Sequence, residues 1–298
     1  METPHQRRTH YREHIEIGFD ALADLYYTYW GDYFHLALFQ EGDDPADLAG
    51  AYERTHERYF ASIGGPASQR ILDVACGGGA FSLWMADHTR GQVLGVDLSS
   101  GQLARARRRL AGRSRHNLSF KQHDLVELDT LDTGSFDAAI SLDAFCYLPD
   151  RRQALRAVAR RLQSGARFLL VDWCRIVRPT ALQRELILVP FYRNWGIADL
   201  ETIAGYRRAM AGAGFRIVAL EDLSDQVIPN WERGYRAALR AVADPVRPGQ
   251  LLKLGLKATT HGVRVLDVAK GQFLVALLAK AAADSGILRY VSVLAERR

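Results

Sequence analysis

A glycine-rich turn near residue 77 has the residue types needed to hold a small cofactor. It follows an apolar run and reads Ile-Leu-Asp-Val-Ala-Cys-Gly-Gly-Gly from Ile71 to Gly79. Glycines at 77, 78 and 79 permit positive φ angles and let a ligand approach the main chain. The helix predicted to follow them offers free N–H groups at its first turn. The turn alone does not distinguish one cofactor from another.

Carboxylates near the ends of three predicted strands indicate that the cofactor contains a nucleoside. Asp97 ends the second strand in Gly-Val-Asp-Leu-Ser, eighteen residues after Gly79, where an acid can accept hydrogen bonds from both ribose hydroxyls. Asp124 follows the third strand in His-Asp-Leu, where a carboxylate can accept a hydrogen bond from the amino group of adenine. With Asp73 near the end of the first strand, this order favours a nucleoside site over three unrelated helix caps.

The turn departs from the motifs of two common nucleotide-binding folds. A dinucleotide fingerprint would place Ala75 and Ala80 where two of its glycines belong, and Asp73 would repel a pyrophosphate. No Gly-x-x-x-x-Gly-Lys-Ser/Thr segment is present, which excludes a P-loop. An acid at Asp73 instead suits the positively charged methionine end of S-adenosylmethionine (SAM), so we expect SAM as the cofactor. The predicted cofactor-binding residues are Asp73, Ala75, Gly77, Gly79, Asp97, Leu98, Gln102, Asp124, Leu125 and Ser141.

The elements that must position these residues alternate between strand and helix patterns. This alternation predicts an α/β fold with a doubly wound, Rossmann-like sheet of seven mostly parallel strands. The predicted strands are 70–75, 92–97, 118–122, 136–142, 166–173, 215–220 and 288–295. The predicted helices are 80–87, 100–111, 151–162 and 199–213, and further helical patterns occupy 231–242 and 266–283.

Two segments outside this core are predicted to cover the pocket. Parallel neighbours are normally joined by one short crossover, so the long helical stretch between the last two strands is interpreted as an inserted cap. The expected organisation is an N-terminal helical lid over 1–60, a SAM-binding core over 61–222, a helical cap over 223–285 and the last core strand over 286–298.

The region from 65 to 175 resembles class I SAM-dependent methyltransferases. Besides the glycine turn and the acids, the segment from Leu162 to Leu170 is similar to the Leu-Lys-Pro-Gly-Gly turn before the fifth strand of that family. Ala75 replaces the usual first glycine, and we expect this to be tolerated through a negative φ. The stretch Trp30-Gly-Asp-Tyr-Phe-His-Leu36 and Thr55-His-Glu57 resemble elements of sterol C-methyltransferases, and the first is also similar to tocopherol methyltransferases.

The same resemblance suggests how the acceptor is handled. Asp143 lies where sterol methyltransferases carry an acid, and phosphoethanolamine- and sarcosine-type enzymes also have Asp there. Methyl transfer to an alkene carbon creates a carbocation, which needs aromatic faces and a base. Asp143 is the predicted base, and Tyr27 is counted with the catalytic residues. For a hydroxyl or amine acceptor, His35 or His123 is the alternative base. The predicted substrate-binding residues are Trp30, Tyr33, Phe34, Tyr147, Trp173, Tyr192 and Trp195.

Each of these assignments has a structural alternative. The aromatic residues of the N-terminal segment could be helix-packing core, Asp143 could cap a turn, and His35 could be a packed, hydrogen-bonded residue. His56 lacks the second histidine of a zinc-binding helix, so no metal ligands are predicted. Magnesium is expected only if the acceptor is a diphosphate.

Composition limits the class of protein. The chain has 298 residues, a net charge of +5 and three cysteines, and no apolar run of transmembrane length, so a cytoplasmic protein without disulfides is expected. The arginines around Arg108 alternate with Ala and Leu as on a solvated helix face, and no nucleic-acid-binding motif accompanies them. We expect a small-molecule substrate, no nucleic-acid partner and no stable membrane insertion. The formation of a homo-oligomer is possible.

The leading interpretation is a methyltransferase of secondary metabolism that acts on a carbon of an isoprenoid-type, largely apolar acceptor. The alternative is an O- or N-methyltransferase of a polyketide, sugar or amine. A sensor that binds SAM without turnover is a third possibility. A nucleic-acid methyltransferase is disfavoured, because the segment after the fourth strand lacks the Asn/Asp-Pro-Pro-Tyr/Phe signature that holds a flipped base.

Overall fold

The computed structural model describes most of the chain. The described residues are 11, 12, 15, 19, 27, 31–111, 113, 116–176, 178–197, 199–243 and 265–298, without the side chains of 241–243 and 265–273. The predicted site residue Trp30 lies outside them.

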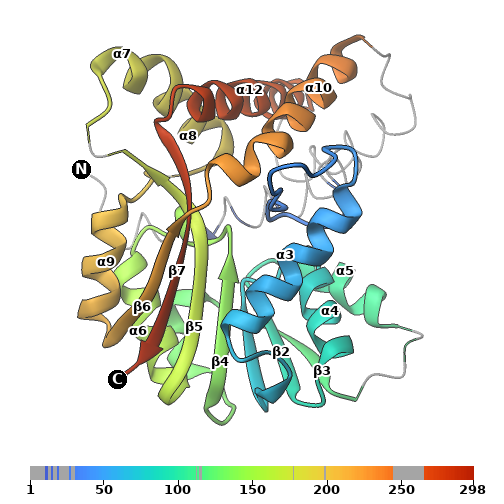
Figure 1. Ribbon diagram of the computed structural model, residues 1–298, viewed down its shortest axis with the longest axis vertical. Coiled ribbons are helices and arrows are strands. Elements are labelled where there is room, and N and C mark those ends of the chain that lie inside the picture. The colour runs from blue at the N-terminus through green and yellow to red at the C-terminus, as the bar shows by residue number, and fades with distance from the viewer. Residues whose placement is uncertain are drawn as a thin grey trace.

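A seven-stranded sheet forms the centre of the protein, in the order β3-β2-β1-β4-β5-β7-β6 (Figure 1). The first five strands of this order run parallel to one another, and β7 runs antiparallel to both β5 and β6. The strands are β1 (Arg70–Val74), β2 (Gln92–Asp97), β3 (Leu118–Gln122), β4 (Phe136–Leu142), β5 (Leu162–Arg175), β6 (Phe215–Asp222) and β7 (Leu288–Arg297). The predicted doubly wound, mostly parallel sheet is therefore confirmed.

Helices cover both faces of the sheet because the central strands are apolar on both sides. One core cluster joins the sheet to α3 (Leu48–Ser62) and α4 (Ala80–His88) through residues such as Tyr59 and Met85. The other joins it to α6 (Arg151–Arg161) and α9 (Ile203–Gly212) through residues such as Leu155 and Tyr206. Helix α5 (Ser100–Leu110) packs against β2 and β3.

Short polar side chains set the helix starts. Ser99 accepts a hydrogen bond from the Gln102 N–H and begins α5, and Asp150 accepts one from Gln153 and begins α6. The helix predicted over 199–213 starts later, at Ile203, because Thr202 is its N-cap and accepts from the Gly205 N–H. β5 extends beyond the predicted 166–173 at both ends, because β4 pairs with it at Leu162 and β7 pairs with it as far as Arg175.

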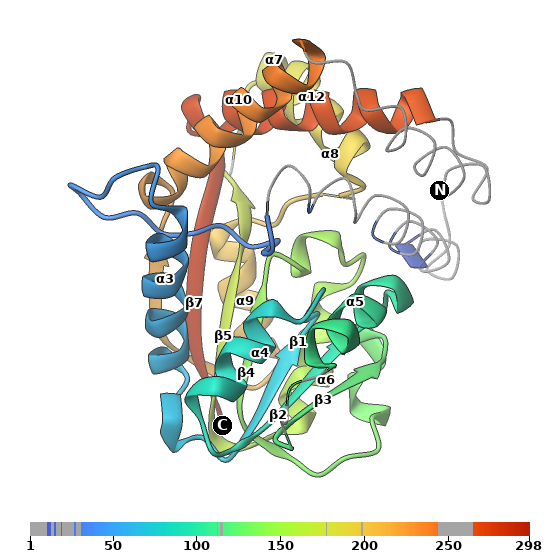
Figure 2. The ribbon, with the colours of Figure 1, turned by 90° about the vertical axis from the view of Figure 1, so that its right-hand side faces the viewer.

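A group of helices lies over the carboxyl ends of the parallel strands (Figures 1 and 2). Two come from the β5–α9 connection, and two come from the long insertion between β6 and β7. They are α7 (Ala181–Gln183), α8 (Val189–Trp195), α10 (Ile228–Ala243) and α12 (Val265–Asp284). The argument that parallel neighbours flank this insertion was wrong, since β6 and β7 are antiparallel. Antiparallel strands need only a short hairpin, so the insertion is still additional to what the sheet requires.

Within the part of the chain that the structure describes, no helix combines the length and apolar character needed to cross a membrane.

Candidate active site

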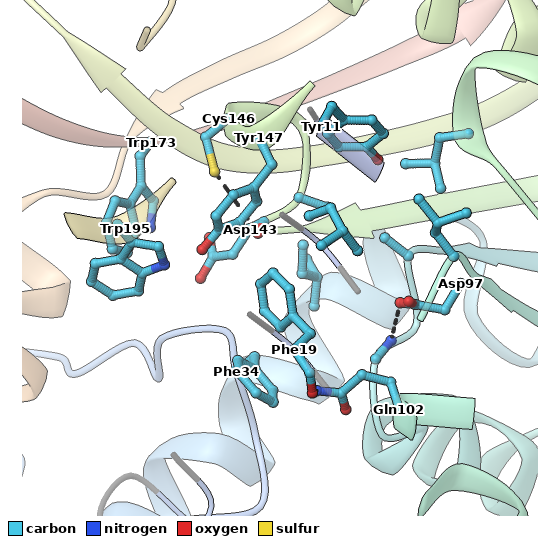
Figure 3. A pocket seen from close by; sticks show the side chains of 17 residues that line it. Tyr11, Phe19, Phe34, Asp97, Gln102, Asp143, Cys146, Tyr147, Trp173 and Trp195 are labelled. Atoms are coloured by element: carbon cyan, nitrogen blue, oxygen red, sulfur yellow. Dashed lines mark hydrogen bonds between the residues drawn. The ribbon is translucent and has the colours of Figure 1, made fainter. Parts of the chain in front are cut away.

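A pocket of about 740 Å³, partly open to solvent, lies at the carboxyl ends of β1, β2, β4 and β5 (Figure 3). One side is formed by predicted cofactor-binding residues, namely Ala75, Gly77, Asp97, Leu98, Gln102 and Leu125. The other side is largely aromatic and includes Phe19, Phe34, Asp143, Cys146, Tyr147, Trp173 and Trp195.

The glycine turn uses left-handed backbone conformations at three positions. Gly77 and Gly79 have φ angles of 52° and 71°, as glycines readily do, and Ala75 has a φ of 62°. The expectation of a negative φ at Ala75 was therefore wrong, because the chain must turn sharply between β1 and α4. A left-handed alanine costs about 1–2 kcal/mol, so this turn holds strain where the family uses glycine. Gly79 also lacks room for a side chain, since a Cβ there would lie 2.7 Å from the Ala106 Cβ.

Asp97 ties the glycine turn to the end of β2. Its Oδ2 accepts a hydrogen bond from the Gly77 N–H at 2.8 Å, and its Oδ1 accepts one from the Ser99 N–H at 2.9 Å. The side chain is nearly buried, yet it lines the pocket. Each carboxylate oxygen has a second lone pair, so the same group can accept from ribose hydroxyls while it holds the turn in place.

Asp73 lies under the glycine turn in an adjoining pocket of about 400 Å³. Its Oδ2 accepts a hydrogen bond from the Ser82 hydroxyl at 2.5 Å. Burial raises the pKa of Asp73 to about 7, and the nearby Asp97 adds to the increase while Ser82 opposes it. A buried carboxyl without a cation suits a ligand that brings a positive charge, as the ammonium group of SAM does.

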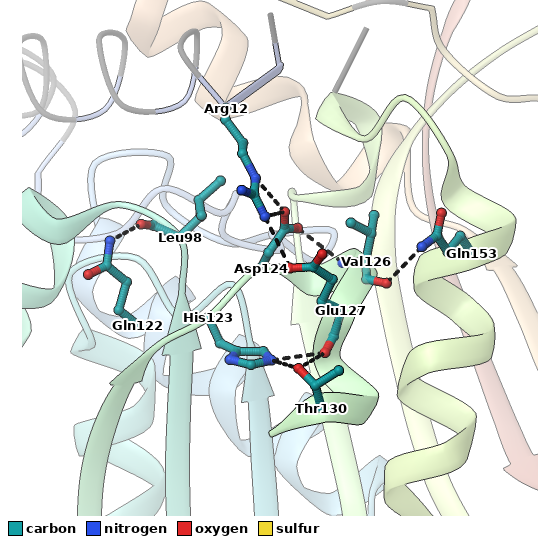
Figure 4. A network of polar contacts seen from close by, with 9 residues as sticks. All are labelled: Arg12, Leu98, Gln122, His123, Asp124, Val126, Glu127, Thr130 and Gln153. Atoms are coloured by element: carbon teal, nitrogen blue, oxygen red, sulfur yellow. Dashed lines mark hydrogen bonds and ion pairs between the residues drawn. The ribbon is translucent and has the colours of Figure 1, made fainter. Parts of the chain in front are cut away.

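Asp124 does not line the main pocket, because Arg12 covers it (Figure 4). The Arg12 Nε donates to Asp124 Oδ2 at 2.9 Å, and its Nη2 contacts Glu127 at 3.1 Å. The other oxygen, Oδ1, accepts from the Val126 N–H at 3.1 Å. An adenine amino group would therefore share this carboxylate with Arg12. Leu125, next to Asp124, does line the pocket, whereas Ser141 is fully buried and donates to the Val74 carbonyl.

Asp143 follows β4 and has an unusual environment. It has a φ of 52°, and both carboxylate oxygens are buried without a hydrogen-bond partner among the described residues. Burial raises the pKa of Asp143 well above its usual value, and the nearby Asp172 adds to the increase. Asp143 lines the pocket, but both oxygens are buried, so direct proton transfer from an acceptor requires rotation of the side chain.

His35 forms part of a buried histidine pair. Its Nε2 lies 2.9 Å from the Nε2 of His56, so one ring donates and the other accepts. Burial lowers the pKa of His35 to about 3. Burial also lowers the pKa of His56 to about 2, and His35 adds to that decrease. A neutral imidazole with such a low pKa is a weak base at neutral pH. His123 lines none of the pockets described here, and its ring lies within hydrogen-bond distance of the Glu127 carbonyl.

Tyr27 lies against the glycine turn. Its hydroxyl donates to Gln102 Oε1 at 2.7 Å, and the Arg105 guanidinium lies 3.9 Å from its ring centroid. A Cβ at Gly78 would lie 2.3 Å from the Tyr27 hydroxyl, so this glycine is required for the contact. Burial raises the pKa of Tyr27, which makes a structural or cation-facing role more suitable for it than proton abstraction.

The predicted substrate-binding residues separate into two groups. Phe34, Tyr147, Trp173 and Trp195 line the main pocket, and the last two pack edge to face at 4.7 Å. Tyr33 lines the adjoining pocket instead, and Tyr192 lines none of the pockets described here. Trp231 of α10 packs on Trp173 at 5.1 Å, so the insertion supports the aromatic wall from behind.

The comparisons with known proteins agree with this geometry. A family profile described as a methyltransferase domain matches residues 71–165. The chain is 30% identical over 218 residues to methyltransferase GfsG of Streptomyces halstedii, covering 72% of this chain and 77% of that protein. This match decides the family. The chain is a class I SAM-dependent methyltransferase.

Other relatives of this methyltransferase differ in the atom named as the methyl acceptor. It is 29% identical to 27-O-demethylrifamycin SV methyltransferase of Amycolatopsis mediterranei, over 74% of this chain and 79% of that protein. It is 29% identical to sterol 24-C-methyltransferase erg6 of Aspergillus fumigatus, over 76% of this chain and 59% of that protein. The fold matches that of geranyl diphosphate C-methyltransferase from Streptomyces coelicolor, with a TM-score of 0.67, 17% identity and 99% coverage of both chains.

Several residues of the methyltransferase pocket were missed in the sequence. Tyr11, Ile15 and Phe19 line it from the N-terminal segment, and Cys146 lines it from the turn after β4. Phe19 packs edge to face on Tyr147 at 5.3 Å, although the two residues are far apart in the chain. The aromatic content of residues 1–60 was the available signal, but it does not say which rings turn inward.

Proposed function

We propose that this methyltransferase transfers the methyl group of SAM to a carbon atom of an apolar, isoprenoid-type acceptor. The observation that carries the proposal is the aromatic wall of the pocket, formed by Phe34, Tyr147, Trp173 and Trp195 opposite the cofactor side. The faces of aromatic rings attract a cation, and this attraction is strongest where water is excluded. Such a wall suits a reaction in which the acceptor becomes cationic.

The bound SAM supplies an electrophilic methyl group on a positively charged sulfur. The residues of this chain then have three tasks, which are to align the acceptor in line with the C–S bond, to exclude water, and to accept the positive charge that moves to the acceptor. The C–S electron pair stays on sulfur, and the acceptor alkene forms the new C–C bond. Loss of a proton restores neutrality, and we assign Asp143 as the acceptor of that proton after its side chain rotates into the pocket.

The neighbouring residues support a carbon acceptor over a hydroxyl acceptor. Oxygen methylation benefits from a base that removes the hydroxyl proton, and His35 is the nearest predicted candidate. Its low pKa and its contact with His56 make it a poor base. O- or N-methylation of a polyketide, sugar or amine is the second candidate, because the chain is similar to a methyltransferase named for an oxygen position.

The proposal is tested with SAM labelled on its methyl group and a panel of acceptors. The panel contains prenyl alcohols and diphosphates, a polyketide phenol, a sugar and an amine. We expect a product whose label is on carbon, identified by mass spectrometry and carbon NMR. Label on oxygen or nitrogen alone would refute carbon methylation. For a diphosphate acceptor, activity should be lost with a chelator and recovered with magnesium.

We also propose that the insertion between β6 and β7 acts as a cap on the acceptor side. Trp231 of α10 contacts Trp173 of the pocket wall, and α12 packs on both α8 and α10. Limited proteolysis tests this role, since an acceptor held under the cap should slow cleavage within 223–285. Equal cleavage rates with and without acceptor would argue against it.

A further inference from the structure

Asp143 is a buried acid with no positively charged partner among the described residues. It lines the same pocket as Ala75 and Gly77, and neither of its oxygens has a hydrogen-bond partner among the described residues. None of the ion pairs found in the described part of the chain includes it. Its left-handed φ of 52° shows that the fold holds the residue in a costly conformation.

The groups that face this carboxyl in the described part of the chain come from β5, β7 and α3, from the segment at Leu36 and from the turn after β4. Tyr290 of β7, Trp173 of β5 and the Leu36 N–H are close enough to oppose the increase in its pKa. The hydroxyl of Tyr290 and the indole N–H of Trp173 are themselves buried, and neither has a hydrogen-bond partner in the described part of the chain. The remaining titratable neighbours are acids or other weakly acidic groups: Asp172 of β5, Tyr52 and Tyr59 of α3, and Cys146 after β4.

Such an environment favours the neutral acid while no cation is present. An isolated buried carboxylate is costly, so it is protonated instead of ionised. The nearby Asp172 strengthens this preference, because two negative charges at short range repel each other. The donors from Tyr290, Trp173 and Leu36 are placed to stabilise a carboxylate once a positive charge arrives.

We propose that SAM binding ionises Asp143, with the sulfonium group supplying the positive charge that this part of the pocket lacks. One proton then leaves for solvent as SAM binds. Methyl transfer converts the sulfonium into the neutral thioether of S-adenosylhomocysteine, which removes the reason for Asp143 to stay charged. Asp143 then takes up one proton, the same number that the acceptor loses. Asp143 is therefore already ionised when methyl transfer makes the acceptor cationic and ready to lose its proton.

The inference depends on SAM as the cofactor and not on the identity of the acceptor. Two other buried acids also have a raised pKa, and their ionisation needs to be distinguished from that of Asp143. Asp73 is placed for the amino-acid end, which SAM and S-adenosylhomocysteine share. Asp172 accepts a hydrogen bond from the Tyr206 hydroxyl, and burial raises its pKa to about 6. The difference between the two ligands therefore isolates groups that respond to the sulfonium.

The experiment is isothermal titration calorimetry of the whole protein with SAM and with S-adenosylhomocysteine. Titrations at neutral pH in buffers of different ionisation enthalpy report the number of protons released. The wild type should release close to one more proton with SAM than with S-adenosylhomocysteine. The Asp143→Asn variant should bind both ligands without this difference. The Asp172→Asn variant should show a smaller difference than the wild type, because loss of Asp172 lowers the pKa of Asp143 and favours its ionisation before SAM binds. Equal proton release for both ligands, or a difference that persists in Asp143→Asn, would overturn the inference.

A second measurement uses the wild type alone and guards against a variant that fails to fold. Infrared difference spectra should show loss of a protonated carboxyl C=O band when SAM binds and not when S-adenosylhomocysteine binds. The SAM dissociation constant should also decrease with rising pH more steeply than that of S-adenosylhomocysteine, by up to tenfold per pH unit. Identical spectra and identical pH dependence for the two ligands would contradict the inference. Failure of SAM to bind at all would instead challenge the cofactor.

Discussion

Replacement of Gly79 by alanine should destabilise the protein through two separable effects. Gly79 has a φ of 71°, and alanine in this region costs about 1–2 kcal/mol. This is offset by a stabilisation of about 0.4–1 kcal/mol, because alanine has less conformational freedom than glycine in the unfolded chain. The added Cβ would lie 2.7 Å from both Ala106 Cβ and Phe120 Cζ, and such overpacking costs about 1–3 kcal/mol. We therefore expect Gly79→Ala to lower the free energy of unfolding by about 1–5 kcal/mol, from these terms together.

The glycine turn itself contains a matched control. Gly77 has a φ of 52°, but a Cβ there would meet only Gln102 Oε1, at 3.9 Å. Gly77→Ala should therefore cost only the backbone term, about 1 kcal/mol. Ala75 already tolerates a φ of 62° in the native protein. Both variants are measured by urea unfolding followed by circular dichroism, and the reasoning fails if their free energies of unfolding agree within error.

Three further changes should have distinct outcomes. Asp124→Ala should cost about 1–2 kcal/mol in urea unfolding, since it removes an N-cap, whereas Arg12→Ala should cost less than about 1 kcal/mol because Arg12 is largely exposed. Trp173→Ala should lower the free energy of unfolding by about 3–5 kcal/mol and raise the acceptor KM, because the buried ring is lost. Trp173→Phe should retain most of the stability. Equal effects of the two variants would refute a packing role. In the folded protein the pKa is about 3 for His35 and about 2 for His56, and both values lie below that of the unfolded chain. The unfolded chain therefore binds more protons in this pH range. As a result, the free energy of unfolding should fall as the pH decreases from about 6.5 to about 3. In His35→Gln this slope should be smaller by up to about 1.4 kcal/mol per pH unit, and an unchanged slope in pH-dependent urea unfolding would contradict the assignment.

Local sequence patterns predicted the strands and the cofactor side of the pocket well. The acid of Gly-Val-Asp-Leu-Ser lies at the end of β2 and contacts the glycine turn, as its position after an apolar run indicated. Carboxyl ends of parallel strands meet at one edge of the sheet, so spacing along the chain is sufficient to bring Ala75, Gly77 and Asp97 together. The same local reasoning missed the φ of Ala75, since residue type alone favoured a negative angle.

The acceptor side was less predictable, because it is built by contacts between distant segments. Arg12 covers Asp124 from 112 positions away, and His35 pairs with His56 across a turn and a helix. Tyr33 and Tyr192 have the residue types of a binding wall, but neither lines the main pocket, whereas Phe19 does. Which ring faces a ligand depends on helix rotation and docking, which short-range periodicity does not specify.

The amino-acid sequence by itself determined the order of the elements, the glycine turn and the acids at the strand ends, because these follow from hydrophobic period and from local backbone chemistry. Only the tertiary structure decided that Asp143 is buried beside Asp172, with no ion-pair partner among the described residues and with the donors of Tyr290 and Trp173 around it. The physical reason is that a carboxyl's ionisation depends on everything within a few ångströms in space. β4, β5, β7 and α3 reach Asp143 only after the sheet has formed.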